Sequence, residues 1–236
     1  MRQPNHPPTL EQLDLTRWAA SLGAVTPEAL AHRRGVSVPS ARARLVAAQR
    51  RGLLVGARPL SGRPALFAAT RAGLHACDAR GIQACNVSPS NAKHLIVCAA
   101  VAAALEHCYP DHRLTGEHEL RRDEREQGHP LASARLLGGA QVAGSDLHRP
   151  DLVLWPDART GGLPVAVEVE LTVKARPRLV DICRAWARCR EVAGALYLAP
   201  QEVERPLLRA IAEARASELV AVVPLGSLPG VEAAFA

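Results

Sequence analysis

The chain has 236 residues, of which 48% are hydrophobic, so it can form one large domain or two ordinary ones with a packed core. Aromatic residues make up only 3%, and the core must therefore be built mainly from aliphatic side chains. No apolar run reaches the ~18 residues that a membrane span needs, which argues against a membrane protein.

The positive charge of the chain is concentrated in its first third. The formal net charge is +6, and residues 1–81 carry twelve arginines, no lysine and four acidic residues, a local net charge of +8. The rest of the chain therefore carries −2. A basic segment joined to a slightly acidic one suggests that the first segment binds a polyanion, although a merely soluble basic surface would have the same charge.

The six cysteines form no C-x-x-C pair, and no secretory signal precedes them. They are typical of reduced, mostly buried thiols in a cytoplasmic protein. Cys183 and Cys189 are a conceivable redox pair, but core packing is favoured. His94 and Cys98 have the i, i+4 spacing of a helical metal site. A packed helix face is again favoured, because no second ligand pair lies nearby in the sequence.

The N-terminal segment predicts three short helices, over residues 9–22, 26–34 and 37–51. Thr26-Pro27-Glu28 has the residues of a helix start, and Gly35 and Gly52 are typical helix ends. A short helix, a glycine turn and an arginine-bearing helix predict a helix-turn-helix, whose last helix would enter the major groove of DNA.

Two short apolar segments follow, residues 53–55 and 65–68, on either side of a Gly/Pro-rich loop. They predict a β-hairpin, and the run from Gly62 through Phe67 to Gly73 resembles the wing and following helix of bacterial winged-helix regulators. Arginine can bond guanine edges or neutralise phosphates. The predicted DNA-contacting residues are Ser40, Arg42, Arg44, Arg51, Arg58 and Arg63.

The second half predicts alternating helices and strands. Residues 92–108 have the pattern of a buried helix, and residues 117–126 that of a solvated helix with alternating charges. Gly138, Gly139 and Gly144 suggest a mobile loop. Strands are expected at 150–155, 165–174, 195–198 and 219–223, with helices after Pro177 and over 202–216. This order implies a mixed sheet covered by helices.

Two acids and a lysine share one face of the expected strand 165–174. Val165, Val167, Val169, Leu171 and Val173 alternate with Ala166, Glu168, Glu170, Thr172 and Lys174. Asp151 opens the preceding strand and could meet Glu168 across the pair. Carboxylates so arranged can bind Mg²⁺ or Mn²⁺, which would activate water for phosphodiester cleavage. The alternative is a solvated face of an edge strand.

Pro150-Asp151 followed by Glu168-x-Glu170 resembles the PD-(D/E)xK nuclease superfamily. More narrowly, residues 148–151 with residues 165–174 are similar to the replication-relaxation family, bacterial winged-helix proteins with a nuclease-like second domain. The resemblance implies catalytic roles for Asp151, Glu168, Glu170 and Lys174, with the metal on Asp151 and Glu168. Glu170 departs from the superfamily pattern, which has lysine there, and Glu117 or Glu119 would supply an additional acid.

The sequence thus predicts an α+β chain. A winged helix-turn-helix DNA-binding domain would span residues 9–82, and a restriction-endonuclease-like α/β domain with a mixed sheet would span residues 91–236. The expected partner is double-stranded DNA, with a homodimer as a further option. The expected role is replication or maintenance of a mobile element, with or without DNA cleavage. A transcriptional regulator whose second domain dimerises or senses a ligand, and a protein-interaction adaptor, are the alternatives.

Overall fold

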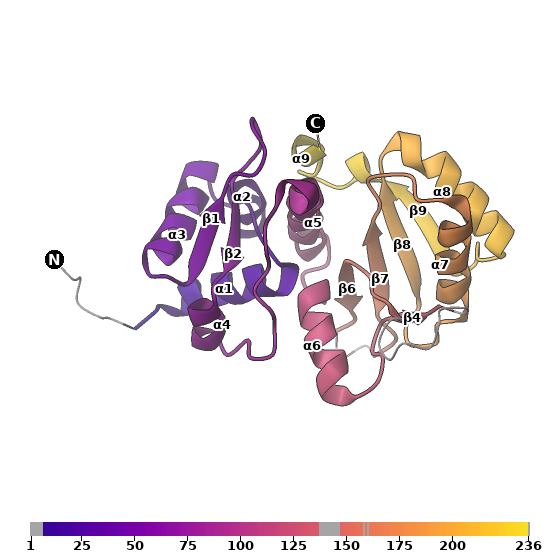
Figure 1. Cartoon of the computed structure of the whole chain (residues 1–236), viewed down its shortest axis with the longest axis horizontal. Coiled ribbons are helices and arrows are strands. Elements are labelled where there is room, and N and C mark those ends of the chain that lie inside the picture. Colours follow the sequence, from indigo (N-terminus) through magenta and orange to yellow (C-terminus); the bar gives the residue numbers. More distant parts are fainter. Residues whose placement is uncertain (1–6, 137–146, 158, 160, 236) are drawn as a thin grey trace.

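The structure is a computed structural model that describes residues 7–136, 147–157, 159 and 161–235. The predicted tail before Pro8 and the loop at Gly138, Gly139 and Gly144 lie wholly or mostly outside these residues. The first part of the chain forms four helices and a hairpin (Figure 1). These elements are α1 (Leu10–Leu22), α2 (Pro27–Arg34), α3 (Val38–Arg50), β1 (Leu54–Ala57), β2 (Leu66–Ala69) and α4 (Arg71–Ala76).

Local capping sets the limits of these N-terminal helices, as the sequence predicted. Thr9 and Gln12 form a capping box at the start of α1. The Thr26 hydroxyl accepts a hydrogen bond from the Ala29 amide at 3.1 Å, and α2 ends at Gly35 in the left-handed conformation with φ 61°. Helix α3 buries Ala41, Leu45 and Ala48, and packs against α2 and β1.

The second part of the chain is a five-stranded mixed sheet with helices on both faces. The strand order is β3-β6-β7-β8-β9, in which β3, β6 and β7 are antiparallel and β7, β8 and β9 are parallel. The sheet strands are β3 (Arg113–Gly116), β6 (Leu152–Trp155), β7 (Val165–Val169), β8 (Gly194–Ala199) and β9 (Val220–Pro224). The helices are α5 (Pro89–Cys108), α6 (Glu117–Gln127), α7 (Arg176–Arg188), α8 (Gln201–Ala214) and α9 (Glu232–Phe235). A separate strand pair, β4 (Ala134–Arg135) with β5 (Leu147–His148), and a short 3-10 turn at Leu225–Ser227 complete the described elements.

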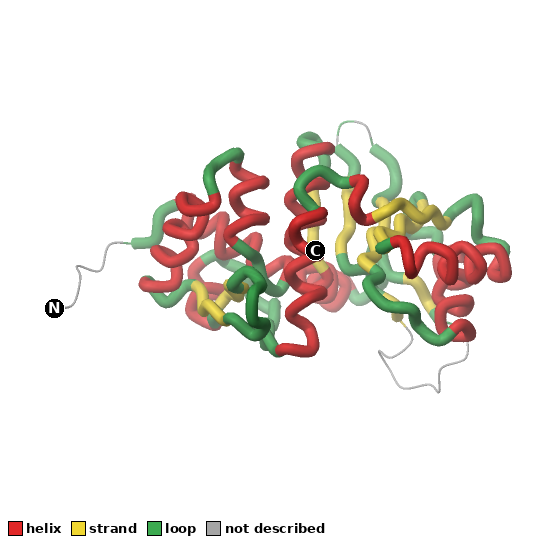
Figure 2. Tube along the Cα trace, turned by 90° about the horizontal axis from the view of Figure 1, so that it is seen from above, coloured by secondary structure: helices red, strands yellow, loops and turns green. Residues whose placement is uncertain are grey.

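The two faces of the sheet are covered by different helices. Val167 and Val169 of β7 belong to the apolar cluster that includes α5, whereas Ala166 of the same strand belongs to the cluster with α7 and α8. This division follows from the alternation of side chains along a strand. Figure 1 shows α7 and α8 on the side of the sheet away from the N-terminal part, and Figure 2 shows the same arrangement of helices and strands from above.

Helix α5 joins the N-terminal part to the sheet. It contacts α2 on one side and β3 and β7 on the other, and one continuous apolar cluster runs from α1 through α5 to β6, β7 and β8. A second connection lies at the end of α1, where the Ser21 hydroxyl accepts a hydrogen bond from the Gly116 amide at 2.9 Å. Residues 9–82 and 91–236 therefore share a core in this structure.

The structure is mixed α/β with a mixed sheet, as the expected α+β class requires, but one predicted strand is shorter. Strand β7 ends at Val169, whereas the sequence predicted a strand to residue 174, so Lys174 lies outside the strand. Two features of the neighbouring segment explain the early end. Strand β6 begins only at Leu152, because the preceding Pro150 has no amide hydrogen to donate. In addition, the Val169 amide donates to the Asp151 carboxylate instead of to a carbonyl of β6.

Helix α6 also differs from the fully solvated helix that its charges predicted. Glu124 is 4% exposed and pairs with Arg149, with its carboxylate oxygen 3.0 Å from Arg149 Nε. The other Glu124 oxygen accepts a hydrogen bond from the Leu131 amide at 3.1 Å.

Among the described residues, no helix combines the length and apolarity needed to cross a bilayer.

Candidate functional site

The predicted acidic residues lie at one end of two neighbouring strands. Strands β6 and β7 are antiparallel with Leu152 opposite Val167. Asp151 and Glu168 are therefore the next residues on the two backbone segments, one step beyond this pair. Strand β7 lies between β6 and β8 and is therefore an interior strand of the sheet. Glu168 and Glu170 are 5% and 4% exposed, which excludes the solvated edge face considered as the alternative.

Asp151 is fixed by three hydrogen bonds to different elements. One carboxylate oxygen lies 2.9 Å from His94 Nε2 on α5, and the other accepts the Val169 amide of β7 at 2.7 Å. The Asp151 carbonyl accepts the amide of Glu117, the first residue of α6, at 2.9 Å. These bonds orient the carboxylate toward α5.

His94 lies between Asp151 and Cys98. The Cys98 sulfur is 3.3 Å from His94 Nε2, and the ligand atoms of the three residues all lie within 4.8 Å of one another. The nearby Cys98 sulfur and the hydrogen bond to Asp151 raise the pKa of His94 to about 12. Burial raises the pKa of Cys98 to about 11.

Glu168 pairs with a different histidine. Its carboxylate lies 2.6 Å from Nε2 of His148 in β5. Burial raises the pKa of Glu168 even though His148 acts against the shift. Burial alone would lower the pKa of His148, but the Glu168 carboxylate raises it above its ordinary value. The rings of Trp186 and His148 pack in a T-shaped arrangement, with 5.7 Å between their centroids.

Glu170 and Lys174 form an ion pair, which brings Lys174 back to the acidic end after the strand has ended. The Glu170 amide still donates to the Leu198 carbonyl of β8 at 3.0 Å, so the backbone remains beside the sheet at this point. Asp151, Glu168 and Glu170 therefore each have a cationic or titratable partner, namely His94, His148 and Lys174. The partners of Asp151 and Glu168 were missed by the sequence analysis.

The predicted DNA-contacting residues lie on α3 and the hairpin. Arg42 and Arg58 line a hollow of about 240 Å³ between these elements, together with Gln49 and Phe67. The Arg42 and Arg44 side chains are 49% and 38% exposed. Arg51 caps α3 and is exposed, Ser40 is half-buried in the first turn of α3, and Arg63 is half-buried at the hairpin.

Two of these arginines have acidic partners on neighbouring helices. Arg42 lies 3.9 Å from Glu28, and Arg44 forms an ion pair with Glu11. Between Glu28 and Asp78 the sequence contains nine arginines and no acidic residue. The arginines on α3 and the hairpin therefore lie in a stretch of sequence that itself contains no acidic residue.

In comparisons with known proteins, no protein-family model, no curated protein and no solved structure matches the chain.

Proposed function

We propose that this chain binds double-stranded DNA through α3 and the β1–β2 hairpin, as a winged-helix protein of the replication-relaxation type. The observation that carries the proposal is the group of arginines on these two elements, in a segment of 49 residues without an acidic side chain. Helix α2, the turn at Gly35 and α3 have the order of a helix-turn-helix, and the hairpin follows as a wing would.

The ion pairs of Arg42 and Arg44 do not oppose this function. Both pairs are at the surface, where such pairs contribute about 0–1 kcal/mol and are screened by salt. A phosphate group can replace the carboxylate of Glu28 or Glu11 at little cost. Arg42 and Arg58 line one hollow, so we expect both to contact the same stretch of DNA backbone.

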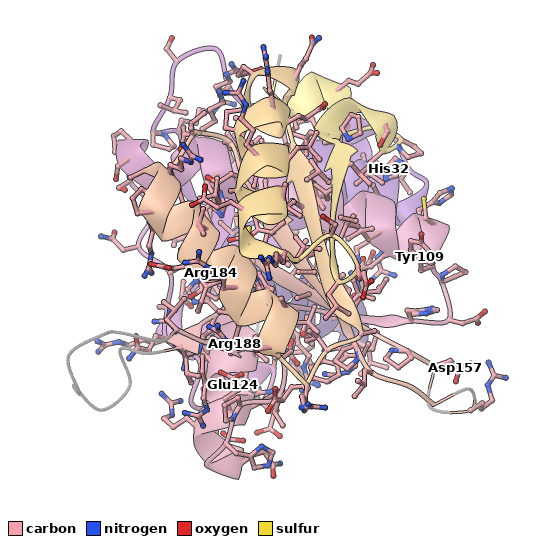
Figure 3. The ribbon with its side chains drawn as sticks, turned by 90° about the vertical axis from the view of Figure 1, so that its right-hand side faces the viewer. His32, Tyr109, Glu124, Asp157, Arg184 and Arg188 are labelled. Atoms are coloured by element: carbon pink, nitrogen blue, oxygen red, sulfur yellow. The ribbon has the colours of Figure 1, made fainter. Side chains whose placement is uncertain are left out.

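The test is binding of the intact protein to a fluorescent DNA duplex across a range of salt concentrations. Arg42→Ala and Arg58→Ala should each weaken binding, and each should reduce the slope of log K against log salt by about 0.9 for one lost phosphate contact. Arg184→Ala is the matched control, because Arg184 lies on the outer surface of α7, on the far side of the sheet from α3 (Figures 1 and 3). Equal effects of the three substitutions, or binding that is insensitive to salt, would contradict the proposal and favour a protein-interaction adaptor.

A second candidate function is metal-dependent cleavage of the bound DNA. The observation that favours it is the burial of Glu168 and Glu170 at the end of an interior strand, next to Asp151. Asp151 and Glu168 would hold Mg²⁺ or Mn²⁺, which polarises the phosphate and activates water. Glu170 and Lys174 complete the group, and Lys174 would contact a phosphate in place of Glu170.

Cleavage is tested with supercoiled plasmid and Mg²⁺ or Mn²⁺. Nicking that disappears in both Asp151→Asn and Glu168→Gln, with unchanged duplex binding, would support the nuclease. Tight binding to one duplex sequence by a homodimer without any nicking would instead favour the transcriptional regulator.

A further inference from the structure

We infer that His94, Cys98 and Asp151 form a binding site for a borderline-soft divalent metal ion, Zn²⁺ first among them. The inference does not depend on DNA binding. The juxtaposition that carries it is a ring nitrogen, a sulfur and a carboxylate oxygen within 4.8 Å of one another. Zn²⁺ is held by these three donor types at about 2.0–2.3 Å, so three ligand atoms of this spacing can surround one ion.

Two separate segments of the chain supply the ligands. His94 and Cys98 are one helical turn apart on α5, and Asp151 comes from the segment that enters β6. Helix α5 is buried along most of its length, so its side chains have little freedom to move apart. The sequence spacing alone showed only the first two ligands, because Asp151 is 57 residues further along the chain.

The surroundings of the three residues match those of a metal site. The Val169 amide donates to the Asp151 oxygen that does not contact His94, which leaves the other oxygen directed at the histidine. Such outer hydrogen bonds orient metal ligands in proteins. The Cys98 side chain is at the buried end, and the His94 side chain is 40% exposed, so an ion can enter from solvent.

The donor set also selects the kind of ion. Mg²⁺ takes oxygen ligands in an octahedral arrangement and retains its water, so a thiolate and an imidazole suit it poorly. Thiolate and imidazole ligands favour zinc and related transition metals. Three protein ligands leave a fourth position for water or a substrate atom, as in catalytic rather than structural zinc sites.

The experiment is titration of the full, untagged chain with Zn²⁺ and, as a spectroscopic probe, Co²⁺. We expect one Zn²⁺ per chain, a thiolate-to-cobalt charge-transfer band, and a rise in Tm that depends on Zn²⁺ concentration. Cys98→Ser should abolish the band. His94→Gln and Asp151→Asn should weaken Zn²⁺ binding by at least the roughly 10–100-fold that loss of an outer hydrogen bond causes. Cys77→Ser is the matched control, because Cys77 is a buried cysteine in the N-terminal part.

Three results would overturn the inference: no thiolate band with Co²⁺, a band that persists in Cys98→Ser, or zinc binding that is lost in Glu168→Gln but intact in Cys98→Ser. The last result would assign the ion to Asp151 and Glu168. Because Cys98 is in the core, circular dichroism of each metal-free variant checks folding, and Asp151→Asn provides a second test at a less buried position. Salt-dependent DNA binding through Arg42 and Arg58 is measured separately, so failure of either proposal leaves the other to its own test.

Discussion

The buried pair of Glu124 and Arg149 allows a quantitative test of how the acidic segment is anchored. The Glu124 side chain is 3% exposed and that of Arg149 is 20% exposed, with 3.0 Å between the carboxylate oxygen and Nε. Arg149→Met keeps much of the aliphatic length and removes the cation. Removing one partner of a buried ion pair typically costs 3–5 kcal/mol, because the remaining charge is uncompensated.

The expected cost lies at the lower end of that range. The Leu131 amide at 3.1 Å continues to donate to Glu124, and the Ala132 amide at 3.5 Å adds a weaker contact. We therefore expect Arg149→Met to lower the free energy of unfolding by about 3 kcal/mol. Glu124→Gln keeps an acceptor for Leu131 and removes the charge, so it should cost only about 1–2 kcal/mol.

Urea unfolding of the two single variants and the double variant measures the coupling between the residues. In the Glu124→Gln background, Arg149→Met should cost about 1 kcal/mol, since no buried carboxylate is left unpaired, which gives a coupling of about 2 kcal/mol. Costs that add to within about 0.5 kcal/mol would refute the reasoning, because independent sites behave in that way. Arg184→Ala is a surface control with an expected effect below about 0.5 kcal/mol.

Three further predictions concern the N-terminal part and its contact with α6. Gly73→Ala should destabilise by about 1–3 kcal/mol in urea unfolding, because the added Cβ would lie 2.0 Å from the Leu53 carbonyl oxygen, and an unchanged stability would contradict this. Leu45→Ala, in the core of α3 at 0% exposure, should cost about 2–5 kcal/mol, whereas Val55→Ala at 52% exposure should cost under about 0.5 kcal/mol, and equal costs would be inconsistent with the packing. Burial lowers the pKa of His118 below its ordinary 6.5, so the folded state favours the neutral imidazole. As the pH drops below 6.5, the free energy of unfolding of the wild type should therefore fall relative to that of His118→Gln. Parallel curves of unfolding free energy against pH for the two proteins would exclude the effect.

The sequence predicted the elements whose signals are local. Thr26-Pro27 and Gly35 set the limits of α2, and the alternation around Glu168 predicted a strand with its acids on one face. The end of that strand was predicted wrongly at Lys174. It depends on where β6 starts and on a side-chain hydrogen bond from Asp151, and neither is a property of residues 165–174 themselves.

The partners of the acidic residues could not be predicted from the sequence for a similar reason. His148 is close to Asp151 in sequence, yet it pairs with Glu168, and Asp151 instead contacts His94 on α5. The i, i+4 spacing of His94 and Cys98 was visible, but its third member comes from a distant segment. Sequence patterns thus indicated which acidic residues lie at this end of the sheet, and only the three-dimensional arrangement showed their partners.

The burial of α5 has a practical consequence for dissecting the chain. From Leu95 to Leu105 every residue of this helix is buried, with α2 on one side and the sheet on the other. A cut between residues 82 and 91 would leave one fragment with an uncovered apolar helix and the other with the matching apolar surface of α2. Such fragments tend to aggregate, so functional studies of either half are best made by point substitution in the whole polypeptide rather than by truncation.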